Sequence, residues 1–278
     1  MAGFLGPGCA RPAFTWPVDR AHPLNSGRIA WWLPIPGRMG GPALADLMGS
    51  YPASTVGSPA WSYSSPFAGV LLDGSTQYAI APAAGLANLD NVTVGVRFTP
   101  TPAFLAAPAG ELIVRQAVPG DGDRGCRIVW VDSGGDRILH TDSRGGYLAQ
   151  ALCPLNAGVE TTIVLTIASS TGAGAQYYKD GQPIATNRLV TLPGNDTSGM
   201  PFNIGSALGG NPCAALISEA FAYDRILSAA EVAQLYEQSR RGYPDLLRRP
   251  RSAALFTLPA FLPWFAAQHA TPLGSGAA

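Results

Sequence analysis

The sequence predicts an all-β fold in which two antiparallel sheets pack as a sandwich, with one short C-terminal helix and extended terminal arms. One observation is a series of short β-rich runs separated by Gly, Pro, Asn or Asp, a spacing typical of sandwiches. Another is that helical periodicity is clear at about 229–240 alone, so the crossover helices of a parallel α/β fold are lacking. The expected strands are 28–35, 70–73, 91–99, 111–117, 126–132, 147–152, 161–168 and 176–179.

The segment at 215–236 predicts a strand followed by a helix. Large side chains recur at every second position from Ile217 to Tyr223, with small side chains between them, as in a strand of a packed sheet. The pattern changes at Ser228, which suits a helix N-cap, and Glu231 stands three residues later as its capping-box partner. Apolar residues then follow at helical spacing, so we expect the helix to cover the sandwich.

Two other strands differ in how their faces are patterned. In 91–99 the apolar residues Val92, Val94, Val96 and Phe98 alternate with smaller or polar residues, which predicts a strand with one buried face. In 161–168 the alternation is broken by Val164, which lies opposite the other large apolar residues. We therefore expect something to cover part of the outer face of that strand.

Four pieces of the chain carry a family resemblance. They read LDGSTQY at 72–78, YKDGQPI at 178–184, NIG at 203–205 and ALISEAFAYDRILSAAEVAQLY at 215–236. In this order they resemble the laminin-G-like, or concanavalin A-like lectin/glucanase, jelly rolls, whose closing piece usually reads Ile-Asp-Glu and then Tyr-Asn-Arg-Ala-Leu-Ser. The chain departs from that form at Ser218, Asp224 and Ile226. The resemblance spans about 72–236 and implies a jelly-roll sandwich.

The chain is predicted to have three parts: an extended arm at 1–24, a laminin-G-like jelly roll at 25–240 and a docking tail at 241–278. Prolines exclude helix from the arm, and the apolar side chains of the tail have no core left in a sandwich that has already closed. The alternatives are a disordered N-terminal end and, for the arginines, a solvated linker after the helix. The predicted docking residues are Phe4, Phe14, Trp16, Arg248, Arg249, Arg251, Phe256, Phe261 and Trp264.

Composition argues against several classes of protein. The 18 basic and 18 acidic residues balance, so a nucleic-acid surface is not expected. The N-terminus lacks the pattern of a secretion signal, and the apolar stretch at 253–267 is interrupted by prolines and too short to cross a bilayer. Cys9, Cys126, Cys153 and Cys213 lack metal-ligand spacing and are expected as free thiols, with a Cys126–Cys153 bridge as the alternative.

The sequence also lacks the usual catalytic patterns. Laminarinase-type enzymes of the resembled fold carry Glu-x-Asp-x-x-Glu on one strand, and none of the five glutamates here lies in such a pattern. The prediction is therefore that the chain is not an enzyme. It is also predicted to have no cofactor. The resemblance implies Ca²⁺ at the rim as an alternative, with Asp121 and Asp123 as ligands, although two nearby arginines argue against it.

Two functions remain from this reasoning. The leading hypothesis, which the resemblance supplies, is a virion structural protein of a tailed phage, such as a capsid decoration, head-fibre or tail-associated protein. It would assemble in the bacterial cytoplasm as a homo-oligomer, such as a trimer, and bind other virion proteins through its arms. The alternative is a carbohydrate-binding or adhesion module that uses the rim loops or the concave face. The candidate sugar platforms are Trp61, Trp130 and Tyr147, each of which could instead belong to the core.

Overall fold

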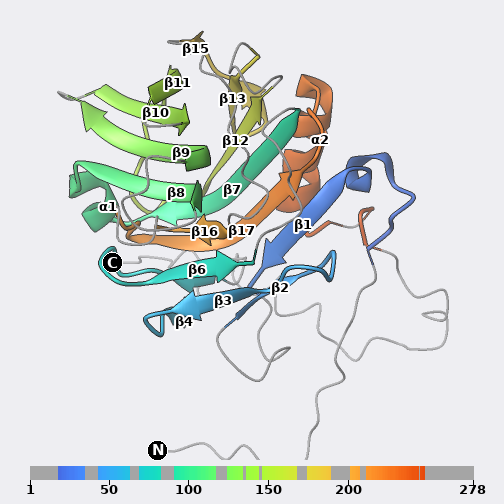
Figure 1. Cartoon of the computed structure of the whole chain (residues 1–278), viewed down its shortest axis with the longest axis horizontal. Coiled ribbons are helices and arrows are strands. Elements are labelled where there is room, and N and C mark those ends of the chain that lie inside the picture. The colour runs from blue at the N-terminus through green and yellow to red at the C-terminus, as the bar shows by residue number, and fades with distance from the viewer. Residues whose placement is uncertain are drawn as a thin grey trace, which may run out of the picture.

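The computed structural model describes residues 18–34, 43–62, 69–82, 91–116, 124–133, 136–143, 146–167, 174–188, 201–206, 211–243 and 245–247. These residues form a sandwich of two antiparallel sheets (Figure 1). The described helices are the 3-10 helix η1 (Pro23–Asn25), α1 (Pro102–Ala106) and α2 (Ala229–Arg240). No helix in this part of the chain has the length and hydropathy that a membrane span requires. The predicted all-β jelly-roll sandwich with one short C-terminal helix is confirmed.

We call the first sheet the helix-side sheet, because α2 packs on it. Its strands are, in spatial order, β14 (Gln182–Pro183), β13 (Gln176–Lys179), β12 (Thr161–Ile167), β7 (Val92–Pro100) and β17 (Ala215–Tyr223). The free edge of β17 is shared by β1 (Arg28–Leu33) and β5 (Gly69–Leu71), and β5 pairs in turn with β4 (Ala60–Ser62).

The second sheet, which we call the far sheet, lies on the other side of the core. Its order is β2 (Ala43–Asp46), β3 (Ala53–Val56), β6 (Tyr78–Ala81), β16 (Phe202–Ile204), β8 (Ala109–Gln116), β9 (Arg124–Ser133), β10 (Asp136–Ser143), β11 (Gly146–Leu152) and β15 (Thr186–Arg188). Because β2 also pairs with β1, it joins the two sheets at one edge. Nine of the 17 described strands were expected from the sequence, and β2, β3, β4, β6, β10, β14, β15 and β16 were not.

The space between the sheets is filled by large apolar side chains. Phe104 of α1 contacts Phe98 of the helix-side sheet and Trp130 of the far sheet, with ring centroids 5.8 and 5.0 Å away. Trp32 and Phe202 make a similar contact at 5.4 Å. Burial of each such side chain contributes roughly 1.5–3 kcal/mol to folding. The core therefore ties the two sheets together through aromatic residues of both.

A second apolar cluster lies on the outer face of the helix-side sheet, beneath α2. Its members come from the sheet, from α2, from η1 and from the segments that follow β2, β17 and α2: Leu24, Trp31, Met48, Val164, Tyr178, Phe221, Tyr223, Leu227, Val232, Leu235, Tyr243 and Leu246. Figure 1 shows α2 beside β7, β12 and β1, on the side away from β8–β10. The prediction that β7 has one buried face was wrong, because Thr93 and Arg97 on its second face are also buried. The covering expected at Val164 is confirmed, and α2 provides it.

Strand β17 departs from the alternation that its sequence suggests. The pairing of β17 with β7 shifts between Ile217 and Glu219, which marks a β-bulge. As a result Ile217 joins the core between the sheets, while Phe221 and Tyr223 join the cluster beneath α2. The expectation that these large side chains share one face with Ile217 was therefore wrong. The bulge is what places Glu219 on the outer face, where it meets the residues around α2.

Helix α2 begins as the sequence predicts. The Ser228 hydroxyl accepts a hydrogen bond from the Glu231 backbone N–H, and the Glu231 carboxylate accepts one from the Ser228 backbone N–H at 2.8 Å. This capping box satisfies N–H groups that a helix start leaves without partners. Arg225 adds an ion pair to Glu231 at 2.8 Å. The start of the helix is therefore fixed to the turn that follows β17.

The described ends of the chain meet on the outer face of the helix-side sheet. Val18 and Leu247 form an antiparallel bridge, and the Asn25 side-chain amide donates to the Leu246 carbonyl at 3.1 Å. Tyr243 and Leu246, at the start of the predicted tail, are buried against the sandwich itself. These contacts do not decide where the arm, jelly roll and tail divide, so the boundaries at 24 and 240 stay predictions. The predicted docking residues all lie outside the described residues.

Candidate functional site

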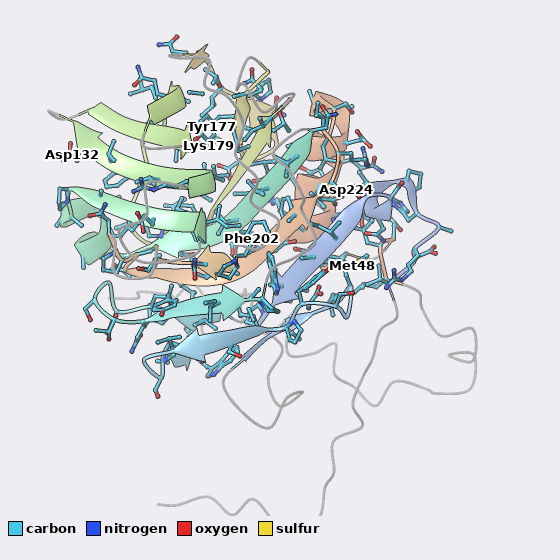
Figure 2. All side chains as sticks on the ribbon, viewed as in Figure 1. Met48, Asp132, Tyr177, Lys179, Phe202 and Asp224 are labelled. Atoms are coloured by element: carbon cyan, nitrogen blue, oxygen red, sulfur yellow. The ribbon has the colours of Figure 1, made fainter. Side chains whose placement is uncertain are left out.

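The outer face of the far sheet carries polar residues where the core does not require them. In β16, Phe202 (labelled in Figure 2) and Ile204 enter the core, so Asn203 between them points outward. Asn203 stands opposite Ile80 of β6, and the same reasoning places Arg127 and Val129 of β9 on this face, because Ile128 and Trp130 are core residues. We call the following residues the outer strip: Ser54, Tyr78, Ile80, Glu111, Arg127, Val129, Gln150, Asn187 and Asn203.

A buried ion pair lies near the centre of the outer strip. Arg127 donates from Nη2 to Oε1 of Glu111 at 2.5 Å. Glu111 is 1% exposed and Arg127 is 8% exposed, so both charges are largely removed from water. A buried charge is tolerated when it has a partner, and the loss of one partner leaves the other charge uncompensated. The pair therefore contributes hydrogen-bonding groups to the strip but little net charge.

Asn203 is the most unusual residue of the outer strip. It is 0% exposed, and neither its side-chain oxygen nor its side-chain nitrogen has a hydrogen-bond partner within the described chain. An amide has two donor hydrogens and an acceptor oxygen, and each buried group left unpaired costs roughly 1–3 kcal/mol. Valine or leucine would fill such a position on a sheet without that cost. The position of Asn203 is thus the kind of site that a polar ligand would complete.

The ion pair and Asn203 have more accessible neighbours on the same face. Tyr78 and Ile80 of β6 and Gln150 of β11 are half-buried, while Ser54 and Asn187 are exposed. Tyr78 offers an aromatic ring, and the others apart from Ile80 offer hydroxyl or amide groups. The outer strip therefore has a buried polar floor flanked by an aromatic ring and neutral polar side chains.

The three predicted sugar platforms are not brought together. Trp130 lies in the core between the sheets with no exposed surface, so it cannot present a ring face to a ligand, and this part of the prediction was wrong. Trp61 lies on β4 of the helix-side sheet and packs partly buried against the core. Tyr147 belongs to β11 of the far sheet. A platform role for Trp61 or Tyr147 stays a prediction.

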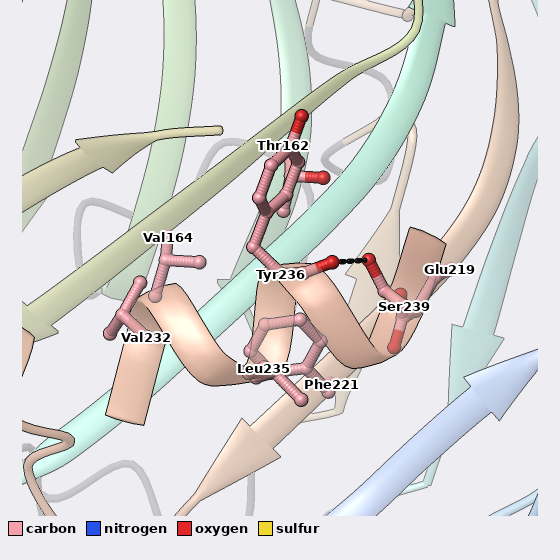
Figure 3. Close-up of a pocket in the computed structure, with 8 residues that line it drawn as sticks. All are labelled: Thr162, Val164, Glu219, Phe221, Val232, Leu235, Tyr236 and Ser239. Atoms are coloured by element: carbon pink, nitrogen blue, oxygen red, sulfur yellow. Dashed lines mark hydrogen bonds between the residues drawn. The ribbon is translucent and has the colours of Figure 1, made fainter. Parts of the chain in front are cut away.

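A cleft lies between α2 and the helix-side sheet (Figure 3). The sheet contributes Thr162, Val164, Glu219 and Phe221, and the helix contributes Val232, Leu235, Tyr236 and Ser239. The cleft is too narrow to admit a water molecule, so it has no room for a ligand. We interpret it as part of the packing between helix and sheet.

Beside this cleft, Glu219 is the centre of a buried polar network. Its carboxylate accepts hydrogen bonds from the Trp31 indole N–H at 2.8 Å and from the Tyr243 hydroxyl. Arg97 Nε lies 3.8 Å from Glu219 and 3.7 Å from Glu160. Burial raises the pKa of Tyr243 well above its ordinary value, and the negative charge of Glu219 raises it further. The network is structural, because it holds residue 243 and the end of α2 onto the sheet.

Neither metal ligands nor disulfides are found in the part of the chain that the structure describes. No group of three His, Cys, Asp or Glu side chains in it is placed to hold a metal ion. Asp121 and Asp123 lie outside the described residues, so the calcium question stays open as a prediction. Cys153 and Cys213 are buried free thiols. Burial raises the pKa of Cys153 to about 11.

Comparisons with known proteins agree with this fold. The sequence profile of the family described as "Concanavalin A-like lectin/glucanases superfamily" matches residues 73–233, which is more than half of the chain. A search among curated proteins found no match. Among solved structures, domain 4 of AbnA, a GH43 extracellular arabinanase from Geobacillus stearothermophilus, in complex with arabinotriose, is similar with a TM-score of 0.54 at 16% identity. That match covers 75% of this chain and 98% of the domain.

Two further structures are similar to this chain. Trypanosoma rangeli sialidase matches with a TM-score of 0.56 at 17% identity, over 77% of this chain and 33% of the sialidase. The receptor-binding domain of botulinum neurotoxin C/D mosaic serotype matches with a TM-score of 0.55 at 11% identity, over 76% of this chain and 51% of that one. At these identities the likenesses show the fold alone. This chain spans about a third of the sialidase chain.

The sialidase match corrects one prediction. The absence of a Glu-x-Asp-x-x-Glu pattern led to the prediction that the chain is not an enzyme, and this is contradicted by the likeness to part of an enzyme chain. That pattern tests for one catalytic arrangement on this fold and says nothing about others. The likeness itself identifies no reaction, because it extends to a third of the sialidase and to the fold alone.

Proposed function

Because the chain belongs to the concanavalin A-like lectin/glucanase superfamily, we propose that it is a carbohydrate-binding domain whose site is the outer strip of the far sheet. The observation that carries this proposal is Asn203, a buried amide without a hydrogen-bond partner among the described residues. Sugar hydroxyls both donate and accept hydrogen bonds, so a hydroxyl-rich ligand satisfies both ends of an amide. The Tyr78 ring on the same face suits the apolar face of a sugar ring.

The geometry of the strip sets a condition on binding. Asn203 has no exposed surface, whereas Tyr78, Ile80 and Gln150 are half-buried around the floor of the strip. Contact between a ligand and the Asn203 amide therefore requires that the atoms covering this amide be displaced. Similar structures support the proposal in general terms, since the similar arabinanase domain was solved with arabinotriose and the similar sialidase with sialic acid.

The experiment is a binding titration of the purified protein against a panel of soluble oligosaccharides, followed by calorimetry. We expect binding to at least one saccharide and a loss of about tenfold or more in affinity for Asn203→Ala, since one lost polar contact of about 1.4 kcal/mol is a factor of ten. The matched control is Asn156→Ala, the same change at an exposed residue in a loop. Equal affinity of both variants and the wild type would place the site elsewhere.

The virion role predicted from the sequence has less support. The relatives reported above are a sialidase, an arabinanase domain and a toxin receptor-binding domain, and none is a virion protein. The predicted docking residues lie outside the described residues, so no contact supports or opposes them. Capsid partners, an oligomer and a location in the virion therefore stay predictions. Deletion of 248–278 without any change in oligomer mass or particle association would contradict them.

A further inference from the structure

We propose that the guanidinium group of Arg28 binds a small carboxylate anion, of the size of formate or acetate. Arg28 is the first residue of β1, and its guanidinium contacts the rings of Trp31 and Tyr223, which belong to the cluster beneath α2. The Arg28 site therefore lies on the outer face of the helix-side sheet, across the sandwich from the outer strip. It is independent of sugar binding.

Arg28 carries a buried charge that no described carboxylate neutralises. The residue is 4% exposed, and neither Nη1 nor Nη2 has a hydrogen-bond partner in the described part of the chain. The other two buried arginines there, Arg97 and Arg127, each form an ion pair with a glutamate, whereas Arg28 forms none. Burial of an unpaired charge is costly, and an anion would remove that cost.

The carboxylates nearest in the network already have other partners. Trp31 donates from its indole N–H to Glu219 and from its backbone N–H to Asp46. Glu219 also accepts from the Tyr243 hydroxyl, and Asp46 accepts from three more backbone N–H groups. Neither carboxylate is hydrogen-bonded to Arg28. Their negative charges nearby favour a ligand with one negative charge over a dianion.

The contacts that Arg28 does make leave one edge of its guanidinium for a ligand. Nε donates to the Tyr223 hydroxyl at 2.6 Å. The Cζ atom lies over the Trp31 ring, 4.1 Å from its centroid, a contact that stabilises the charge but offers no oxygen to the N–H groups. Nη1 and Nη2 remain, and two such nitrogens match the two oxygens of one carboxylate.

The Arg28 site is connected to the place where the described ends of the chain meet. The Tyr223 hydroxyl, which accepts from Arg28, donates to the Leu24 carbonyl of η1 at 2.8 Å. The next residue, Asn25, donates to the Leu246 carbonyl. An anion that fixes Arg28 and Tyr223 should therefore stabilise the packing of η1 and, through it, of the segment at 243–247.

The test is thermal melting in sodium acetate or formate, compared with sodium chloride at equal ionic strength. A ligand that binds the folded state alone raises Tm in a saturable way, by roughly 5–11 °C at about 100 times its Kd for a domain of this size. General salt effects grow steadily with concentration instead. Arg28→Met should abolish the saturable rise. The matched control, Arg241→Met at an exposed position after α2, should retain it.

NMR on the wild type decides the question even if Arg28→Met does not fold. With acetate, the assigned side-chain N–H signals of Arg28 should shift and saturate. The backbone N–H of Asp19, which donates to the Leu246 carbonyl at 2.9 Å, should exchange more slowly. These results would support the proposal, together with a saturable rise in Tm that depends on Arg28.

Two results would overturn the proposal. One is a Tm that changes equally in acetate, formate and chloride, with no shift of the Arg28 signals, which would leave ordered water as the partner of Nη1 and Nη2. The other is an equal rise in Tm for the wild type and a folded Arg28→Met, which would assign the effect to another place. Neither result bears on sugar binding at the outer strip, so the proposed function stands or fails separately.

Discussion

Removal of the buried Glu219 carboxylate should strongly destabilise the sandwich. Glu219 is 1% exposed, accepts hydrogen bonds from Trp31 and Tyr243, and lies 3.8 Å from Arg97. In Glu219→Ala two buried donors lose their acceptor, and Arg97 loses a buried counterion while the half-buried Glu160 stays 3.7 Å away. Loss of one partner of a buried charge pair costs about 3–5 kcal/mol. With a shift of about 2–4 °C per kcal/mol for a domain of this size, Tm should fall by roughly 6–20 °C.

The assay is urea denaturation followed by tryptophan fluorescence, together with thermal melting. We expect the midpoint to fall while the slope with denaturant stays constant, as for a change in stability without a change in the surface exposed on unfolding. Tyr243→Phe removes one of the two donors and should cost less, about 1–2 kcal/mol. Glu237→Ala, on the exposed side of α2, is the control and should change stability by less than about 0.5 kcal/mol. A Glu219→Ala variant within about 1 kcal/mol of the wild type would refute this account of the network.

Three further predictions follow from local features of the fold. Burial alone would raise the pKa of Glu231, but the hydrogen bonds from Ser228, together with the hydrogen bond and positive charge of Arg225, lower that pKa. Its contribution to stability is therefore present above the ordinary carboxyl pKa and lost as pH falls through the lowered one. Glu231→Gln should destabilise at pH 7, and its difference from the wild type in urea titrations should shrink as pH falls below the ordinary carboxyl pKa; a difference that is constant with pH would contradict this. A Cβ on Gly95 would lie 2.2 Å from the Phe221 ring, so Gly95→Ala should cost about 1–3 kcal/mol by thermal melting, and an unchanged Tm would oppose that reasoning. Because burial raises the pKa of Cys153 to about 11, iodoacetamide at about pH 8 should modify it in urea and not in the native protein, as mapped by mass spectrometry; equal labelling in both states would be inconsistent with its burial.

Local sequence patterns predicted much of the fold. Periodicity and the Ser228–Glu231 pair predicted β17, α2 and the capping box between them, and each is confirmed. The alternation in β17 predicted that Ile217 shares a face with Phe221 and Tyr223, and this was wrong. A bulge depends on the pairing of β17 with β7 and leaves no signal in the sequence of one strand alone. The second buried face of β7 was missed for a similar reason, since it depends on where α2 packs.

The candidate site was harder to predict than the fold. Asn203 was recognised as part of a family-like piece, Glu111 as an isolated glutamate and Arg127 as an argument against calcium, but none was expected at a site. They lie on β16, β8 and β9, and only the pairing of β16 with β8 and of β8 with β9 brings them to one face. An asparagine between Phe202 and Ile204, in a short apolar strand, is the one signal in the sequence that could have indicated it.

The bridge between Val18 and Leu247 has a practical consequence for work with this domain. Both residues pack on the cluster beneath α2, on the side of the sandwich opposite the outer strip. A sensor chip or bead coupled near residue 18 or residue 247 would attach the domain through the outer face of the helix-side sheet. The strip would then face the solution, and coupling at either position should give the same orientation.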